Sequence, residues 1–406
     1  MRAKTNFDTR FLAFEEAAHI TTLFIITDFA RNFVTAAKAK GMQIDHVQHY
    51  VMDPTLLYKH MVEIYTLKKT DPKLKNMIFL HIEPESNKHH DELKLFERRF
   101  CMITQHLKME NAAQLAGKKM MMENILLKLN VKGGGHNHYV TPEIYAMPLW
   151  MEKQIMIMGY NVCHPTGQSR ADKMADRLPD PSVVGFSFNG GVNPDSFIGD
   201  YHYQQATRER KSRGVLPPLI IVVRDGISDG QHSHAMDELE TLREAAAEYA
   251  SPVDDYTPHF IFVVATKRHH KRVYADGERG LTNMAAMSVV DDTITDPSLF
   301  EFYMQSHTPI QGTAKPTRYT VLKNDVGATQ DAMQSLMGAL CFEHQISTNA
   351  ISIPEPVYQS DEWAKRGANN MRIIKQMFGE KGQLKKGFTY DDLTNSLSYW
   401  NSPLEK

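Results

Sequence analysis

Five short strand-like runs in the part of the chain after residue 150 constrain its fold more than any other feature. Each run has the length of a strand, and the first four are rich in Val, Ile, Phe or Met, whereas the fifth is more polar. They cover 154–162, 182–189, 219–225, 259–266 and 318–324. Runs of this length and composition, bounded by polar residues, are typical of buried strands. We therefore expect a sheet with several central strands.

Helical patterns lie between and after these runs. Residues 231–250 repeat apolar side chains at helical spacing, and 330–341 form a later helical segment. The expected buried face of the first helix carries Met236, Leu239, Leu242 and Ala246. Helices that alternate with strands predict an α/β architecture for this part of the chain.

The first part of the chain also alternates strand-like and helical segments. Buried strands are expected at Thr21–Thr27 and Asn76–Ile82. A helix is expected after the first strand, ending at Gly41, and others over 58–67 and over most of 91–127. This pattern predicts a small α/β domain with parallel strands.

Composition excludes several classes of protein. The chain has 406 residues, with 46 Lys and Arg against 48 Asp and Glu, so its net charge of −2 gives no indication of a nucleic-acid partner. Its three cysteines are far apart, which fits neither a disulfide framework nor a zinc site. The N-terminus is polar and no apolar run is long enough to span a membrane. We expect a soluble, intracellular protein of two or three domains.

Polar side chains stand near the ends of several expected strands. They are Asn161, Asp225 and Thr320. Two-metal cleavage of a phosphodiester needs three or four acidic or imidazole ligands, and only Asp225 is charged here. From these residues alone, a strand followed by a turn is the favoured interpretation, and a nuclease is not predicted.

Five strings in the chain, taken together and in order, resemble the C-terminal half of an Argonaute/Piwi protein. They lie at 126–138, 157–165, 220–231, 263–272 and 302–325. The resemblance implies an α/β protein in which a Rossmann-like MID domain (1–145) is followed by a ribonuclease-H-like PIWI domain (146–406). Proteins of this family bind a small guide RNA and use it to find complementary transcripts. The family's N-terminal and PAZ domains fall outside the resemblance.

The resemblance also identifies the positions of the family's cleavage site. They correspond to Asn161, Glu209, Asp225 and Thr320. An amide and a hydroxyl are poor ligands for hard cations, so no cleavage activity and no catalytic metal are expected. In this respect the chain resembles the nematode-type secondary Argonautes, which do not cleave.

A second set of residues corresponds to the family's site for the guide 5′ phosphate: His90, Lys94, Gln105, Lys128 and Lys132. Lys128 and Lys132 are four residues apart and therefore share a face. Taken singly, each lysine would be interpreted as part of a solvated surface. His90 replaces a tyrosine, as in the nematode clade, which is associated with guides that carry a 5′ triphosphate. We hypothesise that this change opens the site to extra phosphates.

A third set corresponds to residues that line the family's guide channel. From charge alone, such a run would be interpreted as a solvated loop. The resemblance implies contacts with the guide backbone from Lys267, Arg268, His269, Lys271, Arg272, Lys315, Arg318 and Tyr319.

The expected partners are a small guide RNA, a complementary target RNA and silencing effector proteins, with no membrane. No cofactor is expected, apart from a Mg²⁺ ion that could accompany the guide 5′ phosphate. The expected location is the cytoplasm, the nucleus or both. Two alternatives stay open: an active guided endoribonuclease, and a fragment that binds no RNA.

Overall fold

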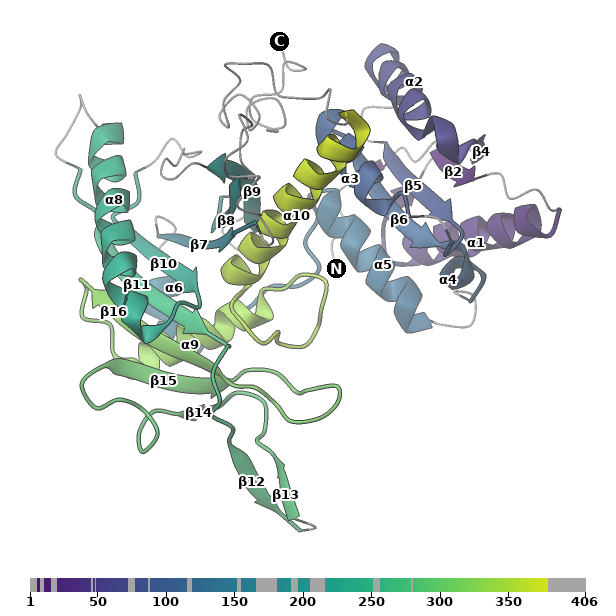
Figure 1. Ribbon diagram of the computed structural model, residues 1–406. Helices are drawn as coiled ribbons and strands as arrows, with labels where there is room; N and C mark the ends of the chain where they lie inside the picture. Colours follow the sequence, from purple (N-terminus) through teal and green to yellow (C-terminus); the bar gives the residue numbers. More distant parts are fainter. Residues whose placement is uncertain are drawn as a thin grey trace, which may run out of the picture. The chain divides into compact units, whose positions relative to one another are not determined.

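The chain divides into two compact units (Figure 1). The first contains Met1–His138 together with Asn369–Lys406, and the second contains Tyr139–Ala368. The sequence assigned the C-terminal segment to the second domain; the domain boundaries stay a prediction. The computed structural model describes 6–7, 11–15, 20–44, 47, 49–71, 77–86, 88–114, 119–151, 155–165, 181–190, 196–204, 216–250, 256–278 and 280–378.

In the first unit, the described strands form a four-stranded parallel sheet with the order β4-β2-β5-β6. These strands are β2 (Phe11–Glu15), β4 (His49–Met52), β5 (Ile78–Glu83) and β6 (Ile103–Lys108), and a separate pair joins β1 (Asn6–Phe7) to β3 (Gln43–Ile44). The helices are α1 (Ile20–Ala39), η1 (Pro54–Leu56), α2 (Leu57–Thr70), α3 (His90–Arg99), α4 (Met109–Gln114) and α5 (Lys119–Lys132). The expected parallel α/β unit is confirmed.

The two faces of β5 differ in chemistry because successive side chains point to opposite sides of a strand. Ile78, Leu80 and Ile82 pack with α1 and α5 in one apolar cluster. The opposite face therefore carries Phe79, His81 and Glu83, all fully buried. This second face is the one that builds the candidate site below.

Two predictions for the first unit are wrong. Thr21–Thr27 lies within α1 and is helical. No glycine or proline separates this run from the helical segment that follows, so one helix continues through both. Residues 103–108, expected to be helical, form β6. The predicted stop at Gly41 is confirmed: its φ is +84°, and its N–H donates to Lys38 O.

In the second unit, the described strands form an eight-stranded mixed sheet with the order β14-β15-β16-β11-β10-β7-β8-β9. Its strands are β7 (Met156–Cys163), β8 (Ser182–Asn189), β9 (Phe197–Gln204), β10 (Leu219–Asp225), β11 (His259–Thr266), β14 (Ser288–Val290), β15 (Phe300–Gln305) and β16 (Thr317–Asn324). A hairpin pairs β12 (Tyr274–Gly277) with β13 (Gly280–Asn283). Strands β7, β10 and β11 run parallel, and the other neighbours are antiparallel. All five predicted strands are present.

Helices cover both faces of this sheet. They are η4 (Ile144–Ala146), α6 (Met147–Met151), η5 (Asp229–Gln231), α8 (His232–Ala250), α9 (Gln330–Phe342) and α10 (Glu355–Phe378), of which residues up to Ala368 belong to this unit. Leu336 of α9 and Val357 of α10 pack with one face of the central strands, and Leu239 of α8 packs with the other. None of the helices in the described part of the chain is long and apolar enough to cross a bilayer.

Glycines let α10 lie directly against the sheet. A Cβ at Gly159 (β7) would stand 2.4 Å from the Pro356 carbonyl, and one at Gly185 (β8) would stand 2.0 Å from Ser360 O. At Gly199 (β9) the nearest atom would be Trp363 Nε1, at 2.3 Å. Because the strands carry glycines at these three positions, α10 approaches the sheet closely enough for its polar groups to contact the strands.

Substitution of Gly185 tests this packing. Gly185→Ala forces a Cβ into the α10 backbone, so we expect the free energy of unfolding to fall by about 2 kcal/mol. Gly230→Ala is the matched control because a Cβ there meets nothing within 4 Å; its effect should stay within about 0.5 kcal/mol. Urea denaturation followed by tryptophan fluorescence measures both, and equal effects would contradict the close packing.

Candidate nucleic-acid interface

In the first unit, α3 and β6 bring the predicted phosphate-site residues together. His90 and Lys94 are four residues apart on α3 and share a face. On β6, Leu107 belongs to the apolar cluster on the α1 and α5 side. The alternation of the strand therefore turns Thr104 and His106 toward α3.

Lys94 and Lys132 meet at one residue from different elements. Lys94 Nζ lies 3.2 Å from Thr104 Oγ1, and Lys132 Nζ donates to Thr104 O at 2.5 Å. Lys94 is buried and also forms an ion pair with Glu97, with 2.5 Å between Nζ and Oε2. Two of the predicted phosphate ligands are thus adjacent, and one of them already has a carboxylate partner.

Gln105 and Lys128 do not converge on Thr104 as Lys94 and Lys132 do. Gln105 Nε2 donates to His106 O, whereas the buried Gln105 Oε1 accepts no hydrogen bond from the described part of the chain. Lys128 lies one turn before Lys132 on α5 and is exposed. To contact a terminal phosphate bound beside Lys94 and Lys132, these two side chains would have to move toward it.

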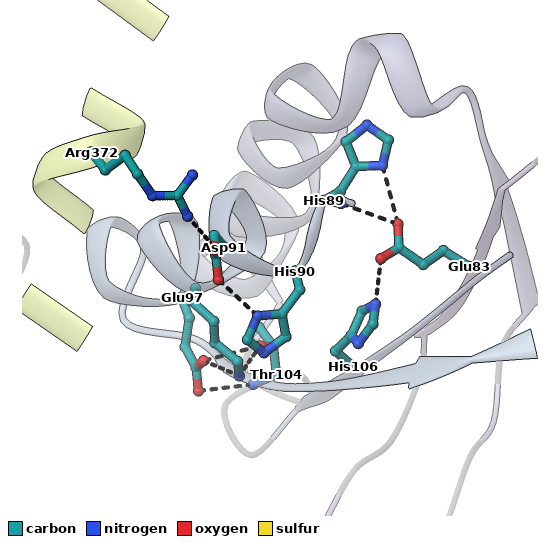
Figure 2. Close-up of polar contacts among 9 residues, drawn as sticks. Glu83, His89, His90, Asp91, Glu97, Thr104, His106 and Arg372 are labelled. Atoms are coloured by element: carbon teal, nitrogen blue, oxygen red, sulfur yellow. Dashed lines mark hydrogen bonds and ion pairs between the residues drawn. The ribbon is translucent and has the colours of Figure 1, made fainter. Parts of the chain in front are cut away.

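A buried carboxylate with histidine partners lies beside this site (Figure 2). Glu83, at the end of β5, is fully buried. His106 Nε2 lies 2.5 Å from its Oε1, and His89 Nδ1 lies 3.1 Å from its Oε2. His81 Nε2 is 3.7 Å from the same carboxylate. Burial opposes ionisation, but hydrogen bonds from His106 and His81 outweigh it and hold the pKa of Glu83 well below its usual range.

His90 has a carboxylate partner of its own. Its Nδ1 lies 2.9 Å from Asp91 Oδ1, and Asp91 is paired in turn with Arg372 (Figure 2). The His90 ring meets the His106 ring edge to face, with centroids 5.1 Å apart. Burial first, then the charges of His106 and Lys94, lower the pKa of His90, while Asp91 opposes the shift.

Sequence reasoning missed Glu83, Glu97 and His106. Glu83 ends an apolar strand, and a carboxylate in that position is a signal of a buried polar site. His106 had no such signal, because the polar residues of 103–108 did not suggest a strand with two distinct faces.

In the second unit, parallel pairing brings two predicted positions to one edge of the sheet. Arg224 of β10 pairs with Tyr160 of β7, so the next residues, Asp225 and Asn161, are neighbours. Asn161 Nδ2 donates to Asp361 Oδ1 of α10 at 2.9 Å. Burial raises the pKa of Asp225, with a smaller contribution from the charge of Asp361, while the Gly226 N–H acts in the opposite direction. The two carboxylates and the amide therefore lie close together.

Thr320 lies elsewhere. It is buried on β16, opposite Val264 and Glu301, and β11 separates β16 from β10. The side-chain amide of Asn161 donates instead to Asp361, a residue that the resemblance did not include. Glu209, the other predicted position, lies outside the described residues.

This group was tested as a metal site. Two divalent cations need three or four anionic ligands, and this edge offers two carboxylates beside a neutral amide. Within the described ranges, no three His, Cys, Asp or Glu side chains are placed to hold a metal ion. The described residues at this edge do not fit the two-metal ligand set.

The predicted channel cations follow β11 directly, at the edge that carries Asp225. Arg268 and Lys271 are exposed, and Lys271 Nζ lies 4.8 Å above the Tyr303 ring. Arg272 donates to the His269 carbonyl at 2.9 Å, and His269 Nε2 lies 2.9 Å from Pro316 O. Lys271 Nζ also donates to Ile294 O, so the side chains of His269, Lys271 and Arg272 are already engaged with backbone carbonyls, whereas Arg268 is exposed.

The remaining predicted channel residues are placed differently from one another. Lys315 is exposed. Lys267 is partly buried and donates to Ser352. Arg318 is paired with Asp229. Tyr319 is fully buried and stacks on Phe302, with centroids 5.0 Å apart, so its ring belongs to the core and not to a surface.

Comparison with known proteins identifies the family. Residues 77–372 match the family described as the Piwi domain. The chain belongs to the Piwi family. The Argonaute protein wago-1 of Caenorhabditis elegans is 29% identical over 341 residues, which cover 78% of this chain and 35% of that protein. The chain therefore spans about a third of this relative's length.

Solved Argonaute structures share the fold. The C-terminal lobe of a budding yeast Argonaute matches 96% of this chain and 83% of its own, with a TM-score of 0.78 and 19% identity. The Kluyveromyces polysporus Argonaute with a guide RNA matches 92% of this chain and 48% of its own, with a TM-score of 0.75 and 20% identity. The predicted α/β architecture, with a ribonuclease-H-like Piwi fold, is confirmed.

Within this Piwi fold, the amide at Asn161 can be tested directly. Asn161→Asp replaces the donor to Asp361 with a third carboxylate, so we expect a lower midpoint of thermal unfolding in EDTA because like charges repel. The added carboxylate also completes a three-carboxylate group, so Mn²⁺ should raise the midpoint of the variant.

Thermal unfolding of the wild type and the variant, each with and without Mn²⁺, makes the comparison. Asn189→Asp is a control, since Asn189 bonds to the backbone of Ile155 and Ile157 away from Asp225. A Mn²⁺ response of equal size in the wild type and Asn161→Asp would contradict the role of the amide.

Proposed function

We propose that this chain binds the 5′-phosphate end of a small guide RNA in its first unit. The observation that carries the proposal is the meeting of Lys94 and Lys132 at Thr104. Two cations from different elements, with the exposed Lys128 one turn away, make a place where several ionic hydrogen bonds can converge on one phosphate. The related Kluyveromyces polysporus Argonaute, solved with a guide RNA, supports this assignment.

Glu97 sets a condition on this binding. Its carboxylate neutralises Lys94 in the absence of ligand. A phosphate must therefore compete with Glu97 for the ammonium group, which favours an end of high negative charge. A 5′ triphosphate, with more anionic oxygens than a monophosphate, meets that condition, and the partly exposed His90 stands on the same face of α3.

We further propose that the second unit holds the guide backbone and its target. Arg268, Lys271 and Lys315 are exposed cations suited to phosphates, whose contact carries no sequence information. Sequence would be read by base pairing between guide and target RNA. The buried ring of Tyr319 is not part of this proposal.

The proposal includes silencing without cleavage. The amide of Asn161 stands where the resemblance places an acidic ligand, and it donates to Asp361. A donor in that place cannot supply negative charge to a cation. Silencing by this chain would then act through effector proteins that it recruits.

An active endoribonuclease is the second candidate, favoured by one observation. Asp225 and Asp361 stay together at the edge of the sheet, which leaves two carboxylates near one another.

A cleavage assay separates the two candidates. We expect the chain, loaded with a guide, to leave a fully matched target RNA intact in Mg²⁺ and in Mn²⁺, because the ligand set is incomplete. Denaturing gel electrophoresis of end-labelled target gives the readout, with an RNA duplex nuclease as the positive control. A product cut at one position, opposite the middle of the guide, would establish the endoribonuclease.

Substitution of the lysines tests 5′-end binding. Lys128→Ala with Lys132→Ala removes two ionic hydrogen bonds, each of which contributes about 1.5 kcal/mol or more. We expect affinity for 5′-phosphorylated RNA to fall about a hundredfold or more, and affinity for 5′-hydroxyl RNA to change little.

Fluorescence anisotropy with both RNAs measures these affinities. Lys119→Ala, an exposed residue at the other end of α5, is the matched control. An unchanged preference for the phosphorylated end in the double variant would show that the phosphate lies elsewhere.

A further inference from the structure

His90 and His106 each hold a carboxylate through one ring nitrogen. His90 Nδ1 faces Asp91, and His106 Nε2 faces Glu83 (Figure 2). An ionised carboxylate only accepts hydrogen bonds, so the nitrogen that faces it carries the hydrogen. In the neutral rings the opposite nitrogens, His90 Nε2 and His106 Nδ1, therefore hold lone pairs. Neither can donate to an anion until its ring gains a proton.

The surroundings keep His90 neutral when no ligand is bound. On its own helix it faces Asp91 and Lys94, and from β6 it faces His106. Arg372 neutralises Asp91 from the part of α10 that belongs to the first unit. Burial, His106 and Lys94 together lower the pKa of His90 despite Asp91. Around neutral pH the free ring is therefore mostly unprotonated.

His106 has a matching environment. Glu83 and His81 face it from β5, and His90 faces it from α3. Glu83, which His89 also contacts, holds the His106 ring in place through its Nε2. The two rings thus each have a carboxylate partner, and His90 shares its face of α3 with Lys94, where an anion would bind.

We propose that binding of a 5′ phosphoryl group beside Lys94 is coupled to the uptake of one proton by His90, whose ring contacts His106. This inference rests on the proposed function. The proton comes from solvent and is held on His90 Nε2, which then donates to a phosphate oxygen while Nδ1 keeps its bond to Asp91. His106 is a positioning residue: its ring contacts His90 and is itself held by Glu83. No covalent bond to the RNA forms or breaks.

The coupling has a defined sign. A bound phosphate raises the pKa of His90 above its value in the free protein. Between those two values, affinity falls as pH rises, by up to about tenfold per pH unit for one proton. Above both values, affinity no longer changes with pH. A 5′-hydroxyl end offers no such charge and takes up no proton.

The number of protons can be measured by isothermal titration calorimetry on the 406-residue chain. One RNA sequence with a 5′ monophosphate or a 5′ hydroxyl is titrated in two buffers of different ionisation enthalpy. At about pH 7.5 the phosphate is already a dianion, since its second pKa is about 6. We expect uptake near one proton for the phosphorylated RNA and near zero for the hydroxyl RNA.

Variants of the two histidines test whether the proton that is taken up resides on His90. His90→Gln keeps an amide donor in place of Nε2 without a titrating group, so the phosphorylated RNA should bind with little proton uptake. His106→Gln keeps a donor to Glu83 and should reduce the uptake. His60→Gln is the matched control, because His60 on α2 also pairs with a carboxylate, Glu63, and should leave the uptake unchanged.

Three outcomes would contradict one or the other of two claims. A clear preference for the phosphorylated RNA with zero proton uptake, or uptake that persists in both His90→Gln and His106→Gln, would overturn the coupling and leave the proposed function standing. Equal affinity for the two RNA ends would overturn the proposed function itself.

Discussion

Parallel strand pairing is the constraint on which both candidate sites depend. Parallel neighbours end at the same edge of a sheet, so residues at or beyond those ends are collected in one place. In the second unit this register sets Asp225 beside Asn161, and the cations that follow β11 leave from the same edge. In the first unit the parallel pair β5 and β6 sets Glu83 within hydrogen-bond reach of His106.

In both candidate sites, charged side chains already have partners from the same chain. Each candidate site contains carboxylates that the chain itself satisfies: Glu97 by Lys94, Glu83 by histidines, and Asp361 by Lys365 and the amide of Asn161. A buried charge left alone would be costly, so these pairs stabilise the empty protein. These pairs also determine which ligands can bind. A phosphate that binds Lys94 must displace Glu97, and a cation that binds Asp361 must displace the amide of Asn161.

Much of the fold was predictable from the sequence, and the reasons are local. β8, β10 and β11 have the predicted bounds because their apolar, largely β-branched and aromatic runs end in polar residues. Thr21–Thr27 failed because a short apolar run fits a helix as well as a strand. Asp361 was missed because its place depends on glycines far away in the sequence that let α10 approach the sheet. Contacts between residues far apart in the sequence leave no local sequence pattern from which they could be predicted.

The central claim is that the chain holds a guide RNA by its phosphorylated 5′ end. The most direct measurement is recovery of the protein from cells of its own organism, followed by sequencing of the RNA that copurifies, with the 5′-end chemistry recorded. The account predicts small RNAs of uniform length with a fixed first nucleotide and a 5′ phosphate or triphosphate. Recovery of the protein without RNA, or with fragments of mixed length and 5′-hydroxyl ends, would contradict it.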